Sequence, residues 1–295
     1  MKKILISVLS IAVVGAVAFG ATRAFFSDTE TSTGNTFAAG AIDLTIDNTS
    51  YALDSNIGVG SSNPQGTLVA SENTSWTLRD LTVEKFFNFT DLKPGDYGED
   101  TISVHVNSND AWLCAAARVT DNSDQDCTEP ELADDSTCFP ESSGINGDLA
   151  QQVNFSFWKD DGDNVLEVGE TPFLSGPISG LNGAGQIALA DTSINSVFGE
   201  NVPIPGNTDV FIGKAWCFGN LVAAPLVQNG IGTDGPIAPD REGTGFTCNG
   251  SAVNNAAQTD KVVGDLQFYA VQSRNNADFT CAGDYIPSWP SPTGE

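Results

Sequence analysis

Apolar and polar residues alternate along several short segments of this chain with the two-residue period of a β-strand. The clearest case runs from Thr101 to Val106, where Ile102, Val104 and Val106 alternate with polar residues. A strand with one packed face and one wet face gives this pattern. Similar segments are Ala41–Ile46, Lys85–Phe89, Trp112–Val119, Val153–Trp158, Asp209–Phe218 and Leu266–Val271.

Turn-forming residues separate these segments, as in Lys93–Asp96 and Pro205–Asn207. Several short antiparallel strands joined in this way predict an all-β fold, either a jelly roll or another β-sandwich. We expect the domain at 41–285, with long loop insertions near 120–150 and 222–260 and a flexible tail at 286–295. Short helices are expected only near Gly147–Gln152 or Ala256–Val263.

The beginning of the chain has the pattern of a secretory signal. Lys2 and Lys3 precede an apolar run of about sixteen residues, shorter than the roughly 20 that a membrane-spanning helix needs. Small residues follow, and we expect signal cleavage between Ala24 and Phe25. An uncleaved N-terminal anchor is the alternative. The mature protein is therefore expected to be secreted, in an extracellular matrix or at the cell surface, and to meet the membrane only during export.

The net charge narrows the choice of partners. The chain carries a formal charge of −26, and loss of Lys2, Lys3 and Arg23 with the signal would lower it by three, to −29. A surface this acidic repels nucleic acid and anionic lipid, and it attracts divalent cations. We expect no nucleic-acid partner.

Six cysteines in an exported chain predict disulfides. Fifteen pairings are open to six cysteines, and the sequence alone does not select one. The pairing that we expect is Cys127 with Cys138, Cys217 with Cys248, and Cys114 with Cys281. Zinc is the alternative use of cysteine, but the sequence has no C-x-x-C pair and one histidine.

One acidic run is the best candidate for a binding site. It follows the predicted strand Val153–Trp158 and carries carboxylates around a glycine, the hard oxygen ligands that calcium prefers. The candidate calcium ligands are Asp161, Asp163, Glu167 and Glu170, with the backbone carbonyl of Val165. The spacing departs from the standard EF-hand rule, and a solvated hairpin turn without metal is the alternative.

Other acidic and aromatic residues are expected to have structural roles. The acidic residues at 121–126, with Glu129, Glu131 and Asp134–Asp135, are predicted to lie in solvated loops. The aromatic residues of the predicted strands are expected in the core rather than on a sugar-binding platform: Trp112, Trp158, Trp216 and Phe218.

The sequence offers no catalytic constellation. His105 is the only histidine, there is no H-E-x-x-H motif, and no nucleophile motif accompanies it. We expect His105 to be a solvated residue on the polar face of its strand and the protein not to be an enzyme.

Three strings resemble the TasA and camelysin family. The first pairs AFFSD at 24–28 with NTFAAGAIDL at 35–44, directly after the predicted signal. The others are DLKPGD at 91–96, before the strand at Ile102, and DLQFYAVQ at 265–272. About a third of the chain carries such strings, and the cysteine-bearing insertions depart from the family's best-known members.

The resemblance implies a jelly-roll domain that polymerises with copies of itself into biofilm-matrix fibres or pilus-like filaments, after processing by a SipW-type signal peptidase. Residues 25–40 would be an extended arm that adds a strand to a neighbour's sheet, anchored by Phe25, Phe26 and Phe37. The arm folding back onto its own domain is an alternative. Two other functions stay open: a monomeric surface adhesin, and the metallopeptidase activity ascribed to camelysin relatives.

Overall fold

The computed structural model describes residues 42–53, 68–138, 146–228 and 243–289, which lie within the compact unit Gly40–Glu295. The predicted signal peptide and arm fall outside these residues, and so do Ala24, Phe25, Phe26 and Phe37. Among the described residues, no helix is long and apolar enough to cross a membrane.

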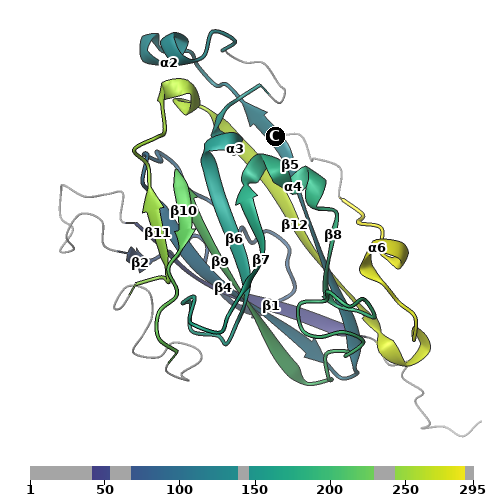
Figure 1. Ribbon diagram of the computed structural model, residues 1–295. Coiled ribbons are helices and arrows are strands. Elements are labelled where there is room, and N and C mark those ends of the chain that lie inside the picture. Colours follow the sequence, from purple (N-terminus) through teal and green to yellow (C-terminus); the bar gives the residue numbers. More distant parts are fainter. Residues whose placement is uncertain (1–41, 54–67, 139–145, 229–242, 290–295) are drawn as a thin grey trace, which may run out of the picture. The chain divides into compact units, whose positions relative to one another are not determined.

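Antiparallel β-sheets dominate the fold, which confirms the all-β prediction (Figure 1). The seven-stranded sheet has the order β2-β1-β4-β9-β6-β7, with β3 also paired to β1. Its strands are β1 (Asp43–Leu53), β2 (Leu68–Ala70), β3 (Trp76–Arg79), β4 (Tyr97–Asn107), β6 (Val153–Asp160), β7 (Pro172–Pro177) and β9 (Thr208–Phe218).

A three-stranded sheet of order β12-β5-β8 packs on one face of the larger sheet. It consists of β5 (Ala111–Ser123), β8 (Gln186–Ala190) and β12 (Lys261–Gln272), and a separate hairpin pairs β10 (Asn220–Ala223) with β11 (Phe246–Asn249). Ile102 and Val104 of β4 are fully buried in one cluster with Leu113 of β5 and Leu189 of β8. The inward faces of both sheets therefore share one hydrophobic core, which makes the domain a β-sandwich.

In the described ranges, helices are short and lie in the connections. They are α2 (Glu129–Asp134), α3 (Leu149–Gln152), α4 (Leu181–Ala184) and α6 (Cys281–Asp284), with the 3-10 turns η1 (Ile178–Gly180), η2 (Asn255–Ala257) and η3 (Ser273–Asn275). The helix expected near Gly147–Gln152 is α3. The segment Ala256–Val263 instead begins in η2 and enters β12.

Most of the predicted strands are present, but Lys85–Phe89 is not a strand. Phe86 turns into the core, where its ring meets Phe268 of β12 at 6.1 Å between ring centroids. The carbonyl of Phe86 accepts a hydrogen bond from Nζ of Lys214, which is buried and also pairs with Asp100. The ammonium group of Lys214 thus takes up the carbonyl of Phe86, which a strand would use to pair with a neighbour. The segment therefore does not join a sheet.

The three disulfides of the structure pair the cysteines as expected from the sequence. Cys114 bonds to Cys281, Cys127 to Cys138, and Cys217 to Cys248. The first bond holds α6 and the residues after it against the outer face of the smaller sheet. Residues 286–289, expected to begin a flexible tail, continue this cover, because Trp289 packs there under the guanidinium of Arg118.

The outer face of the larger sheet depends on one residue without a side chain. Trp158 of β6 lies directly beside Gly213 of β9 and is fully buried. A Cβ at Gly213 would lie 2.0 Å from Cε2 of the indole ring. The missing side chain at position 213 is therefore what lets the indole lie flat on the sheet.

We expect Gly213→Ala to lower the free energy of unfolding by about 1–3 kcal/mol, because the buried ring must move to make room for the methyl group. Urea unfolding measures the change. Gly183→Ala is the control, since nothing lies within 4 Å of a Cβ there; its effect should stay within about 0.5 kcal/mol. Equal effects of the two substitutions would contradict this account.

Candidate cation site

The predicted calcium run forms the long loop of the β6–β7 hairpin, and it folds back over the outer face of the larger sheet. Leu166 anchors it, fully buried against Trp158 and Ala215. The amide of Leu166 donates to the carbonyl of Thr244 at 3.0 Å, and its carbonyl accepts from the amide of Leu226 at 3.0 Å. These bonds fix the loop to two distant segments, so its acidic residues have little freedom.

Tight backbone turns direct the carboxylates of the loop inward. Gly162 and Asn164 have positive φ angles of 110° and 69°, which glycine and asparagine tolerate best. Oδ1 of Asp163 accepts a hydrogen bond from the amide of Val165 at 3.0 Å. Both oxygens of Glu170 accept backbone amides, from Asp161 at 3.0 Å and from Glu167 at 2.9 Å. Glu170 therefore closes the loop on itself.

The structure brings three carboxylates together. Asp160, Asp161 and Asp163 each offer an oxygen, and these oxygens lie within 4.8 Å of one another. Asp163 and Glu167 are buried, at 2% and 0% exposure. Val165 is also buried and contributes its amide to Asp163. The predicted residues thus share one loop, with Asp161 and Asp163 at its acidic centre.

Sequence reasoning missed Asp160 and Glu99. Asp160 ends β6 and accepts hydrogen bonds from Thr101 at 2.7 Å and Trp158 at 3.3 Å. Glu99 lies on β4, fully buried, and neither of its carboxylate oxygens has a hydrogen-bond partner. The alternation along β4 predicted a wet face here. Thr101 and Ser103 on this face are buried instead, and Thr101 bonds to Asp160 at the start of the hairpin loop.

Burial raises the pKa of four carboxyls at this site, those of Glu99, Asp160, Asp163 and Glu170. It raises the pKa of Glu99 well above its usual value, with Asp160 and Asp100 adding to the effect. Burial raises the pKa of Asp160 to about 6, that of Asp163 to about 7 and that of Glu170 to about 8, and neighbouring carboxylates contribute in each case.

Among the described residues, no basic side chain forms an ion pair with Glu99, Asp160, Asp161 or Asp163. Burying several carboxylates is costly unless protons or a cation neutralise them. Calcium takes six to eight oxygen ligands, which carboxylate and carbonyl groups supply. The cluster therefore has the chemistry of a site for a hard divalent cation.

The chain lacks the histidine ligands of a catalytic zinc site. His105 is the single histidine in the sequence, and its ring nitrogens contact Asp47 at 2.9 Å and Asp209 at 2.6 Å. It is partly buried between β1 and β9 rather than solvated as expected. The six cysteines are all bound in disulfides. Carboxylates are left as the ligands.

The fold and the site together define a β-sandwich protein with a buried carboxylate cluster on one outer face. Residues 1–171 match the family described as camelysin metallo-endopeptidase. The match spans more than half of the chain, and the chain belongs to this family. The resemblance noted from the sequence is thereby confirmed. No curated protein matches the chain.

Calcium is expected to raise the melting temperature of the chelator-treated protein, because the ion would bind the folded cluster and relieve repulsion among its acids. At a calcium concentration about 100 times the dissociation constant, the stabilisation would be about 2.7 kcal/mol, or roughly 5–10 °C. Differential scanning calorimetry measures this rise.

Asp163→Asn should diminish the calcium-dependent rise. Asp80→Asn removes the same charge at an exposed position and serves as the control. A melting temperature that changes with neither calcium nor chelator would refute the cation site. Equal calcium-dependent rises in the melting temperature of the two variants would refute it as well.

Proposed function

We propose that this protein is an exported, non-enzymatic structural subunit that assembles with copies of itself into extracellular fibres or matrix. A signal peptidase of the SipW type would cut between Ala24 and Phe25. The freed segment Phe25–Phe37 would then add a strand to the sheet of a neighbouring copy. Membership of the camelysin family supports this proposal, but the observation that carries it is the open edge of β12.

Three other edge strands, β7, β2 and β8, are protected in ways that natural proteins use against unwanted pairing. Strand β7 begins at Pro172 and ends at Pro177, which have no N–H to donate, and β2 is only three residues long. The amides of Val197 and Phe198 donate to carbonyls of β8 at 3.0 and 2.8 Å. These edges are poor acceptors for a further strand.

Strand β12 is the exception. It has 12 residues and pairs with β5 alone among the described strands. Its central segment, Leu266–Val271, has no charged residue and no proline. Leu266, Phe268 and Ala270 point at the core but stay partly exposed, whereas Leu113 on the neighbouring β5 is fully buried. A strand added beside β12 would cover them.

The predicted arm is suited to this edge. Its segment Phe25–Phe37 is close to β12 in length, and three phenylalanines flank a polar run. Main-chain hydrogen bonds would supply affinity in such strand addition, and the apolar side chains would supply register. Each subunit would give one strand and take one, which makes a head-to-tail filament.

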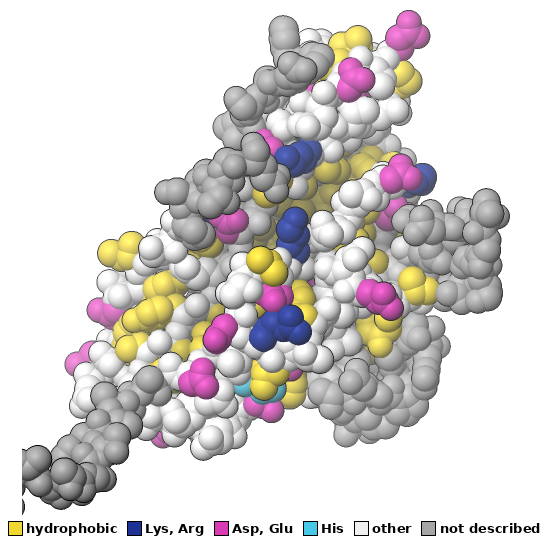
Figure 2. Space-filling model, turned by 180° about the vertical axis from the view of Figure 1, so that it is seen from behind, with side chains coloured by type: hydrophobic (Ala, Val, Ile, Leu, Met, Phe, Trp, Pro, Cys, Tyr) yellow, Lys and Arg dark blue, Asp and Glu magenta, His cyan; other side chains and the backbone are white. Residues whose placement is uncertain are grey.

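Charge would oppose this assembly. Each mature chain would carry a formal charge of −29, which is the −26 of the full chain less Lys2, Lys3 and Arg23, and Figure 2 shows acidic side chains scattered over the face in view, with few basic ones. Like-charged subunits repel each other, and the repulsion is weaker at higher salt or with bound cations. Calcium bound at the carboxylate cluster would lower the negative charge of each subunit and so would favour polymer formation.

The family description favours a second candidate function, a metal-dependent endopeptidase. The chain has a single histidine and its six cysteines are all in disulfides, so it lacks the histidine and cysteine donors of a usual zinc site. Cleavage of casein by the purified protein, stopped by a chelator, would favour the peptidase over the structural role.

Deletion of residues 25–37 from the mature protein should abolish polymerisation and leave a folded monomer, because the donated strand is gone while the sandwich core is intact. Electron microscopy and sedimentation measure the outcome. Phe25→Asp with Phe26→Asp is the point-variant counterpart and should have the same effect. Fibres formed by the deleted protein would contradict strand donation.

Assembly should also protect the backbone amides of Leu266–Val271 from hydrogen exchange, because the outward N–H groups of β12 become paired. Exchange mass spectrometry of fibres against monomers tests this. Strand β7 is the internal control and should change little. Protection of β7 without protection of β12 would show that subunits meet at a different edge.

A further inference from the structure

A second group of carboxylates lies at the far end of the smaller sheet. Asp124 follows the last residue of β5 and Asp260 precedes the first residue of β12. Ser123 pairs with Lys261 across the ladder, so the two aspartates are placed opposite each other. Glu131 of α2 joins them, and an oxygen from each of the three residues lies within 4.8 Å of the others.

Asp124 and Glu131 are buried, contrary to the solvated loop expected from the sequence, and Asp260 is half-buried. Asp124 and Glu131 have 0% exposure, and Asp135, at the end of α2, has 7%. Like charges opposite each other in a sheet destabilise it. Among the described residues, no Lys or Arg forms an ion pair with Glu131, Asp135 or Asp260.

The fold fixes one oxygen of Glu131 and one of Asp260. Oε2 of Glu131 accepts from the amide of Thr128 at 3.2 Å and from the hydroxyl of Thr259 at 3.0 Å. Oδ2 of Asp260 accepts from the amide of Leu149 at 3.0 Å. These bonds set the orientation of the two side chains before any ligand arrives.

Two other oxygens of the group are left without a partner. Oδ1 of Asp135 accepts from the amide of Thr137 at 2.7 Å, but Oδ2 of Asp135 and Oε1 of Glu131 are buried and accept no hydrogen bond. A buried acceptor without a donor is costly, and it is rare in folded proteins.

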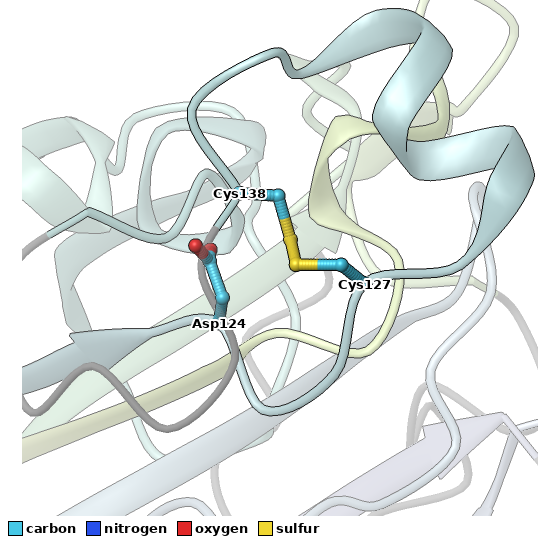
Figure 3. A group of neighbouring side chains, drawn as sticks. All are labelled: Asp124, Cys127 and Cys138. Carbon is cyan, nitrogen blue, oxygen red and sulfur yellow. A yellow bond between two sulfur atoms is a disulfide. The ribbon is translucent and has the colours of Figure 1, made fainter.

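A disulfide holds the insertion that carries this group. Figure 3 shows the Asp124 carboxylate beside the bond between Cys127 and Cys138, which closes the loop around α2. Because these sulfur atoms are bonded to each other, the available ligands are oxygens. The covalent staple limits how far Glu131 can move from Asp124, so the group stays assembled in the folded protein.

We propose that Asp124, Glu131 and Asp260 bind a divalent cation, calcium by their oxygen chemistry, with Asp135 completing the site. The ion would hold the 124–148 insertion onto the ends of β5 and β12. This site shares no residue with the cluster around Asp163, and it does not depend on fibre formation. The chain would therefore bind calcium in two places.

Isothermal titration of the chelator-treated mature protein with calcium chloride tests the proposal. Glu131→Gln should remove one bound ion or weaken one class of site by more than about tenfold. The substituted amide would keep a carbonyl oxygen for Thr128 and Thr259, so the helix should form. Glu129→Gln, at an exposed position of the same helix, is the matched control and should bind as the wild type does.

Limited proteolysis gives a second readout without that substitution. Calcium should slow cleavage within 124–148, and Asp163→Asn should retain this protection because it alters only the first cluster. An identical calcium isotherm for the wild type and Glu131→Gln would overturn the proposal. Loss of all calcium-dependent protection in Asp163→Asn would overturn it as well.

Discussion

The burial of several carboxyl groups beneath the β6–β7 loop is the constraint on which the candidate site depends. Glu99 is fully enclosed with no hydrogen-bond partner, and Asp160 and Asp163 lie beside it. Apolar contacts keep the loop closed, above all those of Leu166 on Trp158. The hydrophobic packing of the outer face therefore holds the acids together against their mutual repulsion, and a bound cation would turn that repulsion into attraction.

The unequal size of the two sheets has a separate consequence. Three strands cannot cover the inner face of seven, and side chains outside the strands fill the remainder. Phe86 does this beside β12, held in place by the buried Lys214 and packed against Trp76. The partly exposed core positions of β12 lie at this margin. One edge is thus left suited to a further strand, in a fold whose other edges are short, proline-bounded or hydrogen-bonded.

The two carboxylate clusters are built on the same principle from different parts. In each, backbone amides and hydroxyl groups hold one set of oxygens, and other buried oxygens have no donor. A tightly turned hairpin supports the first cluster, and a disulfide-closed insertion supports the second. Preorganisation of this kind lowers the cost of ordering ligands when an ion binds.

The sequence by itself determined what depends on neighbouring residues in the chain. The alternation at Ile102–Val106 identified a core strand, and the acidic spacing after Trp158 identified a loop that gathers carboxylates. Only the tertiary structure decided that Glu99 lies under that loop, that Asp124 faces Asp260, and that Lys85–Phe89 leaves the sheet. Strand register and the covering of a sheet face join residues far apart in sequence, and local periodicity carries no information about those contacts.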